Sequence, residues 1–195
     1  MLAAAARTNL MPAGLPAGRR TPRGRLRWYL AHTPEGMERL TCGKLKQLMP
    51  HDLLDDAFVL SKEHWMKRNG VWSLHTTQMY PEYFFAATAD VLGLCKALSK
   101  LSFHVDVVGA RERACMPLSE EVRAFFERTT DAAHVVRSST ASIEDGVLHV
   151  LDGPLVGEEE RIVKVDRHKR RCWVQIGEGD GSFLQTFALD IPCKS

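Results

Sequence analysis

The sequence predicts an α+β fold made of two small domains. In residues 26–128 helix-like and strand-like stretches follow one another, whereas residues 143–195 show strand-like alternation interrupted by turns. Between them, residues 129–142 are rich in small and polar side chains, which is typical of a linker. At 195 residues and 45% hydrophobic, the chain can bury one or two modest cores.

The first elements of residues 26–128 are a strand, a helix and a hairpin. A short strand is expected over residues 28–32, and apolar residues at helical spacing predict a helix over residues 37–48, which Pro50 ends. Residues 57–77 predict a β-hairpin, because Asn-Gly at positions 69–70 lies between two strand-like runs. Both central residues of the favoured hairpin turn need positive φ, and Asn-Gly adopts it readily.

Four more elements complete this domain. An aromatic strand is expected within residues 79–86, and a helix over residues 90–100 follows from its apolar spacing. Residues 103–108 indicate another strand. A last helix begins near residue 117, with Ser119 placed to cap its first turn. The sequence therefore predicts a sheet accompanied by helices.

Residues 147–176 predict a hairpin of a small barrel with a positively charged tip. A turn at Asp152-Gly153-Pro154 follows the first strand, because proline fixes φ and the glycine beside it is free. The loop at residues 166–171 has five basic or histidine side chains against Asp166 alone, which favours a phosphate backbone as its partner. The candidate RNA-binding residues are Lys164, Arg167, His168, Lys169, Arg170 and Arg171.

Three blocks resemble the NusG family of transcription elongation factors. Residues 27–38, RWYLAHTPEGME, and residues 79–86, MYPEYFFA, are similar to segments of its amino-terminal domain. The family's KOW motif is matched by Val150, Gly153, Pro154, Leu155 and Gly157. The chain departs from the family pattern at Glu82 and at residues 158–160, three glutamates, where glycine is usual. The resemblance implies an antiparallel sheet flanked by helices, followed by a small KOW β-barrel.

The resemblance also implies a polymerase-binding surface on residues 26–128. In the family this surface receives the clamp helices of the largest RNA polymerase subunit, and here it would comprise Trp28, Tyr29, Tyr80, Pro81, Tyr83 and Phe84. Successive strand side chains point to opposite faces, so we expect about half of the six to be core. Tyr80 and Tyr83 are the expected exposed contacts, since interface tyrosines readily find hydroxyl partners.

Within the family, the basic loop is most similar to that of the specialised LoaP group. This implies a transcription antitermination factor that binds elongating RNA polymerase and nascent RNA, including a hairpin, close to the DNA of the elongation complex. Trp173, next to the loop, is either core or a base-stacking platform. One alternative is a general NusG factor that couples to Rho or to a ribosomal protein through Leu155. The other is a ribosome-associated KOW protein that binds RNA.

No catalytic or metal site is expected. The five cysteines, Cys42, Cys95, Cys115, Cys172 and Cys193, form no CxxC motif, which favours reduced thiols in the cytoplasm. P-loop and dinucleotide-binding motifs are lacking, so no cofactor is expected. An enzyme using a cysteine, or His104 with Asp106 on one strand face, is the remaining alternative and would need a pocket of convergent polar groups.

The amino-terminal residues predict a disordered basic arm over residues 1–25. Residues 1–27 contain six arginines and no acid, with too little apolar surface to fold. A targeting segment is the alternative, but no apolar stretch follows Arg19-Arg20. We therefore expect no membrane partner.

Overall fold

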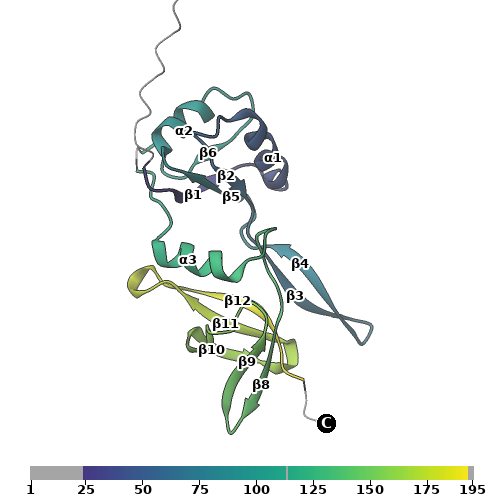
Figure 1. Ribbon diagram of the computed structural model, residues 1–195. Helices are drawn as coiled ribbons and strands as arrows, with labels where there is room; N and C mark the ends of the chain where they lie inside the picture. The colour runs from purple at the N-terminus through teal and green to yellow at the C-terminus, as the bar shows by residue number, and fades with distance from the viewer. Residues whose placement is uncertain (1–23, 113, 193–195) are drawn as a thin grey trace, which may run out of the picture.

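The structure is a computed structural model that describes residues 24–112 and 114–192. The basic arm predicted over residues 1–25 lies outside the described residues except for its last two positions, and so does Cys193. The fold is mixed α and β (Figure 1). Its first half contains β1 (Arg27–His32), α1 (Glu38–Leu48), β2 (Asp56–Phe58), β3 (Ser61–Arg68), β4 (Val71–Gln78), β5 (Tyr83–Thr88), α2 (Val91–Leu98), β6 (Asp106–Val107) and α3 (Glu120–Thr129).

The second half consists of strands and three short 3-10 turns. In chain order these are β7 (Val135–Val136), β8 (Ser139–Glu144), β9 (Val147–Asp152), η1 (Glu159–Arg161), β10 (Ile162–Asp166), η2 (Arg167–Lys169), β11 (Arg171–Ile176), η3 (Gly179–Gly181) and β12 (Phe183–Asp190). In the described part of the chain, every helix is too short or too polar to traverse a lipid bilayer.

The first sheet is antiparallel, in the order β2-β5-β1-β6, and it is buried on both faces. Because successive strand side chains point to opposite faces, Tyr29 and Phe84 enter a core with α1 and α2, whereas Trp28 and Phe85 enter a second core on the other face. The expected antiparallel sheet with flanking helices is therefore present.

Local signals set the ends of several elements as predicted. Helix α1 ends at Leu48, just before Pro50, and the Ser119 hydroxyl accepts a hydrogen bond from the Val122 N–H at the start of α3. The strand predicted over residues 103–108 was too long, since only Asp106 and Val107 pair with β1. Strand β1 ends at His32, where the chain turns toward Pro34, so the residues before Asp106 have no strand to pair with.

The predicted hairpin is present as β3 and β4, which pair along their full lengths and project from the body (Figure 1). It begins at Ser61 and not at Ala57, because Ala57 and Phe58 belong to β2 and pair with β5. Asn69 and Gly70 both have positive φ, 50° and 82°, as its turn requires. Strand β7 pairs in parallel with the base of β3 at Ser61 and Lys62.

The remaining strands form a curled five-stranded sheet in the order β10-β11-β12-β8-β9, which has the shape of a half-barrel. At the predicted turn, Gly153 lies close to the backbone of β8. Gly153 has φ of 98°, and a Cβ there would lie 2.7 Å from the Ser139 Cα. Any other residue would therefore clash with the backbone of β8 as well as adopt an unfavourable conformation.

Helix α3 lies between the two sheets, and one core runs through all three (Figure 1). Phe125 and Phe126 of α3 are fully buried, and the Phe125 ring lies 6.1 Å from that of Phe187 in β12. The same core includes Trp28 of the first sheet and Val174 of the curled sheet. The two halves therefore share one core, in addition to the core that the first sheet forms with α1 and α2.

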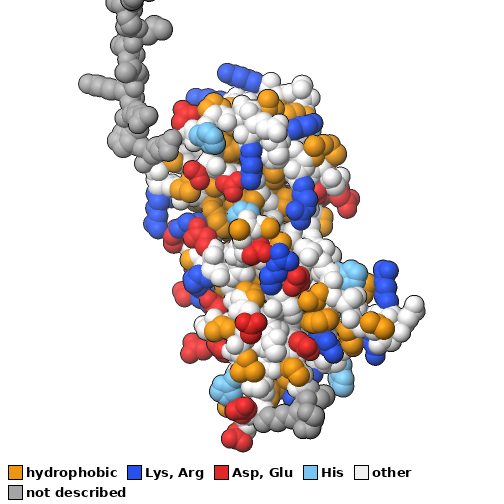
Figure 2. Space-filling model, turned by 45° about the vertical axis from the view of Figure 1, so that its right-hand side comes forward, with side chains coloured by type: hydrophobic (Ala, Val, Ile, Leu, Met, Phe, Trp, Pro, Cys, Tyr) orange, Lys and Arg blue, Asp and Glu red, His pale blue; other side chains and the backbone are white. Residues whose placement is uncertain are grey.

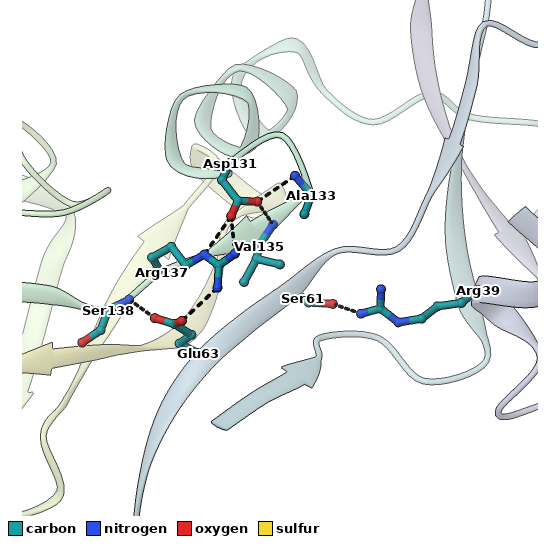
Figure 3. A network of polar contacts seen from close by, with 8 residues as sticks. All are labelled: Arg39, Ser61, Glu63, Asp131, Ala133, Val135, Arg137 and Ser138. Atoms are coloured by element: carbon teal, nitrogen blue, oxygen red, sulfur yellow. Dashed lines mark hydrogen bonds and ion pairs between the residues drawn. The ribbon is translucent and has the colours of Figure 1, made fainter. Parts of the chain in front are cut away.

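Residues 129–142, the expected linker, include β7 and the start of β8 and take part in the polar network drawn in Figure 3. Asp131 accepts hydrogen bonds from the N–H groups of Ala133 and Val135 and from the Arg137 guanidinium. Arg137 also pairs with Glu63 of β3 at 3.0 Å, and Glu63 accepts the Ser138 N–H. The small and polar side chains that suggested a flexible tether make a hydrogen-bonded junction here.

Candidate nucleic-acid interface

The basic loop is a single 3-10 turn held by its own acid. The Asp166 carboxylate accepts the Lys169 N–H at 3.1 Å, and Arg170 then adopts the left-handed conformation with φ of 47°. This turn leaves Arg167, His168 and Lys169 exposed at the end of the loop. The loop therefore presents its charge outward, as a site for phosphate requires.

Arg170 joins the loop to the β3–β4 hairpin. Its guanidinium carbon lies 4.8 Å from the ring centre of Trp65 and 5.3 Å from that of Trp72, both of which are cation–π contacts. Its Nε lies 3.4 Å from an Asp190 carboxylate oxygen. The hairpin and the basic loop, about a hundred residues apart in sequence, therefore lie side by side.

A cleft of about 500 Å³ opens between the hairpin and the loop. Lys169, Arg170 and Arg171 line it from the loop, and Lys62, Lys67, Trp65 and Trp72 line it from the hairpin. Glu63 is the single acid in the lining, and Arg137 already pairs with it. Flat aromatic rings among cations are the combination that binds nucleic acid bases and phosphates.

Lys62 has a structural part in this cleft. Its ammonium donates to the Thr186 carbonyl and hydroxyl oxygens, both at 2.8 Å, and so ties β3 to β12. Burial lowers the pKa of Lys62 below its ordinary value. Lys62 therefore positions the hairpin, whereas Lys169 is exposed to a ligand.

Trp173 faces outward on the curled sheet, between the buried side chains of Cys172 and Val174. Two of the predicted RNA-binding cations cover its ring, Lys164 Nζ at 4.9 Å and Arg171 Cζ at 4.6 Å from its centre. Trp173 is therefore not a core residue. Its position is compatible with the other interpretation, a platform on which a base can stack.

The hairpin residues of this cleft were not among the predicted site residues. Trp72 lies directly opposite Lys67, and Trp65 opposite Leu74, so the strand pairing places these four side chains on one face. That face could have been derived from Asn69-Gly70 and the alternation around it. Its contact with the basic loop could not, because no local pattern encodes it.

Half of the predicted polymerase-binding residues are interior. Trp28, Tyr29 and Phe84 are buried, in agreement with the expectation that about half of the six residues belong to the core. Trp28 and Phe84 lie on opposite faces of the first sheet. They cannot form the surface itself. Pro81 is exposed and Tyr83 is half-buried against the His32 ring, 5.4 Å away.

Tyr80 is less free than predicted. It is half-buried, its ring lies 5.9 Å from that of Phe85, and burial raises its pKa to about 12. The accessible part of the aromatic block is therefore Pro81 with the outer edges of the tyrosines on either side.

Leu155 and Glu158, the first of the three glutamates, belong to the contact between α3 and the curled sheet. Leu155 is fully buried, and its N–H donates to the Ser139 hydroxyl. Glu158 is 8% exposed and accepts hydrogen bonds from Arg128 of α3, at 2.7 Å and 3.0 Å. Glu158 also pairs with Arg161 at 2.9 Å. The departure from glycine after Gly157 therefore supplies a buried carboxylate between the two halves.

The residues of the enzyme alternative gather around a second hollow of about 440 Å³, which Cys95, His104 and Asp106 help to line. Asp106 pairs with Arg111 at 3.3 Å. Burial raises the pKa of the Cys95 thiol to about 11, and the nearest sulfur, Cys115 Sγ, lies 3.8 Å away. A thiol with a raised pKa is a poor nucleophile. Among residues 24–112 and 114–192, no three His, Cys, Asp or Glu side chains are grouped to hold a metal ion.

A scan against protein-family models gave no match, and neither did a search of curated proteins. Function must therefore be inferred from the residues and their geometry.

Proposed function

We propose that this chain is a NusG-type transcription antitermination factor of the specialised, LoaP-like kind. Its amino-terminal sheet domain would bind elongating RNA polymerase, and its curled sheet, as a KOW domain, would bind nascent RNA. Acting in the cytoplasm without chemistry of its own, it would hold the polymerase clamp closed across the DNA channel and so suppress pausing and termination.

The observation that carries this proposal is the cationic loop beside aromatic rings. Lys169, Arg170 and Arg171 are contiguous in sequence, and all three line the cleft that Trp65 and Trp72 also line. Such a surface suits RNA better than a protein groove, because phosphates need cations and unpaired bases need flat rings. The elements before it follow the order strand, helix, hairpin, strand, helix, strand and helix that was expected for the polymerase-binding domain, with β2 as an additional strand before the hairpin.

RNA polymerase would bind the exposed edge of the aromatic block, at Tyr80, Pro81 and Tyr83. These residues lie in the turn before β5 and at its start, where Glu82 has φ of 68° and its N–H donates to the Glu38 carboxylate at 2.7 Å. The turn is therefore held in one conformation, which lowers the entropy cost of binding a partner.

The general NusG alternative is less well supported, since it needs Leu155 at a partner surface and Leu155 is fully buried. The ribosome-associated alternative uses the same cationic loop. Co-purification with ribosomes but without RNA polymerase would favour it over the proposal.

The RNA part of the proposal is tested by neutralising the loop. Replacing Lys169, Arg170 and Arg171 together by Gln should weaken binding to a structured RNA. It should also reduce the slope of log K against log salt by about one unit for each phosphate that the protein no longer binds. Fluorescence anisotropy over a series of salt concentrations measures both effects.

The matched control replaces Lys44, Lys96 and Lys100, three exposed lysines of α1, α2 and the turn after α2, by Gln. Net charge falls equally, so the control should keep the salt slope of the original protein. An unchanged affinity in the loop variant would refute an RNA-binding curled sheet.

The polymerase part is tested by replacing Tyr80 and Tyr83 with Ala. Association with RNA polymerase should fall, since the exposed aromatic edge is removed, while binding to RNA should stay unchanged. A pull-down with purified polymerase and an RNA anisotropy titration on the same preparation separate the two. Loss of both would indicate misfolding, because Tyr80 also packs against Phe85.

A further inference from the structure

We propose that the cleft between the β3–β4 hairpin and the basic loop is a site for one unpaired nucleotide of the bound RNA. The base would stack on the tryptophans of the hairpin, and its phosphate would bind Lys169 and Arg170. This inference rests on the proposed RNA binding and makes it specific, since neither half of the molecule would form the site alone.

The cleft has the size and the support that a built site needs. Its volume of about 500 Å³ lies in the ordinary range of small-ligand pockets. Trp65 is fixed by a hydrogen bond from its Nε1 to the Ser138 hydroxyl, at 3.2 Å. The two hydrogen bonds from Lys62 to Thr186 join the hairpin wall of the cleft to β12 on the other side. A ligand therefore meets walls that are already positioned.

The charge of the cleft fits a phosphate. Glu63 is the single acid in the lining, and its carboxylate already accepts hydrogen bonds from Arg137 and from the Ser138 N–H. Arg171 Nε lies 3.5 Å from Asp166, whereas no carboxylate among the described residues pairs with the ammonium of Lys169. Lys67, above the Trp72 ring at 5.8 Å, adds a further cation. The excess positive charge favours a negatively charged ligand.

The aromatic rings identify the other half of the ligand. Arg170 now covers both tryptophans through cation–π contacts, whereas a phosphate would offer its guanidinium charge-assisted hydrogen bonds. An incoming RNA backbone can therefore draw Arg170 off the rings and leave Trp72 open to a base. Paired bases are already stacked within a helix, so only an unpaired nucleotide can enter.

Figure 2 shows hydrophobic and basic side chains close together on the arm that projects from the body, where the hairpin lies. Val71 is 68% exposed near the tip and Leu74 is 41% exposed on the same face as Trp72. The hairpin therefore extends the surface along which the RNA on either side of the bound nucleotide can run.

The experiment compares two RNA probes on the full chain, a fully paired duplex and the same duplex with a one-nucleotide bulge. The bulged duplex should bind more tightly by about fivefold to a hundredfold, the range that stacking of one base supports. Trp72→Leu should remove this preference, and Trp72→Phe should keep most of it. Anisotropy gives the affinities, and quenching of tryptophan fluorescence reports contact with the rings.

Two further variants are controls for changes outside the cleft. Leu74→Ala changes the same hairpin face outside the cleft lining and should keep the preference. Trp173→Leu removes the outward tryptophan of the curled sheet and should keep it too. Circular dichroism melts confirm that each variant is folded.

Each other outcome overturns the inference in a recognisable way. Equal affinity for both duplexes, with binding still dependent on Lys169, Arg170 and Arg171, would leave the proposed function standing without a nucleotide site. A bulge preference abolished in Trp173→Leu but kept in Trp72→Leu would place the base on the outer face. Binding of neither probe would remove the proposed RNA function as well.

Discussion

Two contacts between the halves of the described chain, one at α3 and one at the β3–β4 hairpin, are opposite in character. The α3 contact, formed by Phe125 and Phe126 against the curled sheet, is apolar and fully buried. The hairpin contact, formed by β3, β4 and the junction that follows α3, is polar and aromatic and leaves a cleft open. A closed apolar contact provides stability, whereas an open polar contact with aromatic rings is available for binding.

The largest effect is expected from Phe125→Ala in the α3 contact. Truncating a fully buried phenylalanine should lower the free energy of unfolding by about 3–5 kcal/mol. Because both halves share this core, unfolding should remain a single transition that shifts as a whole. Chemical denaturation followed by circular dichroism and tryptophan fluorescence measures it.

Leu74→Ala on the hairpin is the control and should stay within about 0.5 kcal/mol of the original protein, since Leu74 is exposed. Two separate transitions, of which only one moves in Phe125→Ala, would contradict a shared core.

A smaller effect is expected from Glu158→Gln at the polar edge of the same contact. The change weakens the pairs with Arg128 and Arg161 and should cost roughly 1–2 kcal/mol, because Arg128 is half-exposed and regains water. Glu160→Gln, two residues on and exposed, is the matched control and should change almost nothing. Equal effects of the two would show that Glu158 is not a structural carboxylate.

The smallest effect is expected in the hairpin contact, from Asp131→Asn. Burial acts to raise the pKa of Asp131, but hydrogen bonds from the Val135 N–H, the Arg137 side chain and the Ala133 N–H lower it below its ordinary value of 3.8. A carboxylate with a lowered pKa stabilises the fold above its unfolded pKa, and that stability is lost as pH falls through the folded pKa.

The stability difference between the original protein and Asp131→Asn should therefore be about 1 kcal/mol or less near neutral pH and should shrink below about pH 4. Denaturation at several pH values measures it, with Asp152→Asn at an exposed carboxylate for comparison. A difference that grows on acidification would mean that Asp131 has the opposite role.

What the sequence could predict was local. Asn69-Gly70 indicated the hairpin, Ser119 the start of α3 and Pro50 the end of α1, because each depends on the conformation of a few neighbouring residues. The small and polar residues after α3 predicted a tether, and in the structure they make a hydrogen-bonded junction, since the same composition is compatible with either.

The site was predictable only in part for the same reason. The charge of Lys169, Arg170 and Arg171 is visible in sequence, and so is the alternation that places Trp65 and Trp72 on one face. Their contact across about a hundred residues depends on how α3 and the junction set the hairpin against the curled sheet. The burial of Leu155 depends on the same packing.

The central position of β12 in the curled sheet affects the order in which the strands can pair during folding. This strand lies in the middle of the curled sheet, between β11 and β8, and Lys62 of β3 bonds to it as well. On the ribosome, β8 to β11 therefore wait for residues 183–190 before their pairing is complete, and loop closure over such separations slows folding. Because Lys62 of β3 bonds to Thr186 of β12, the wall of the cleft that the hairpin provides also needs residues 183–190 to be in place.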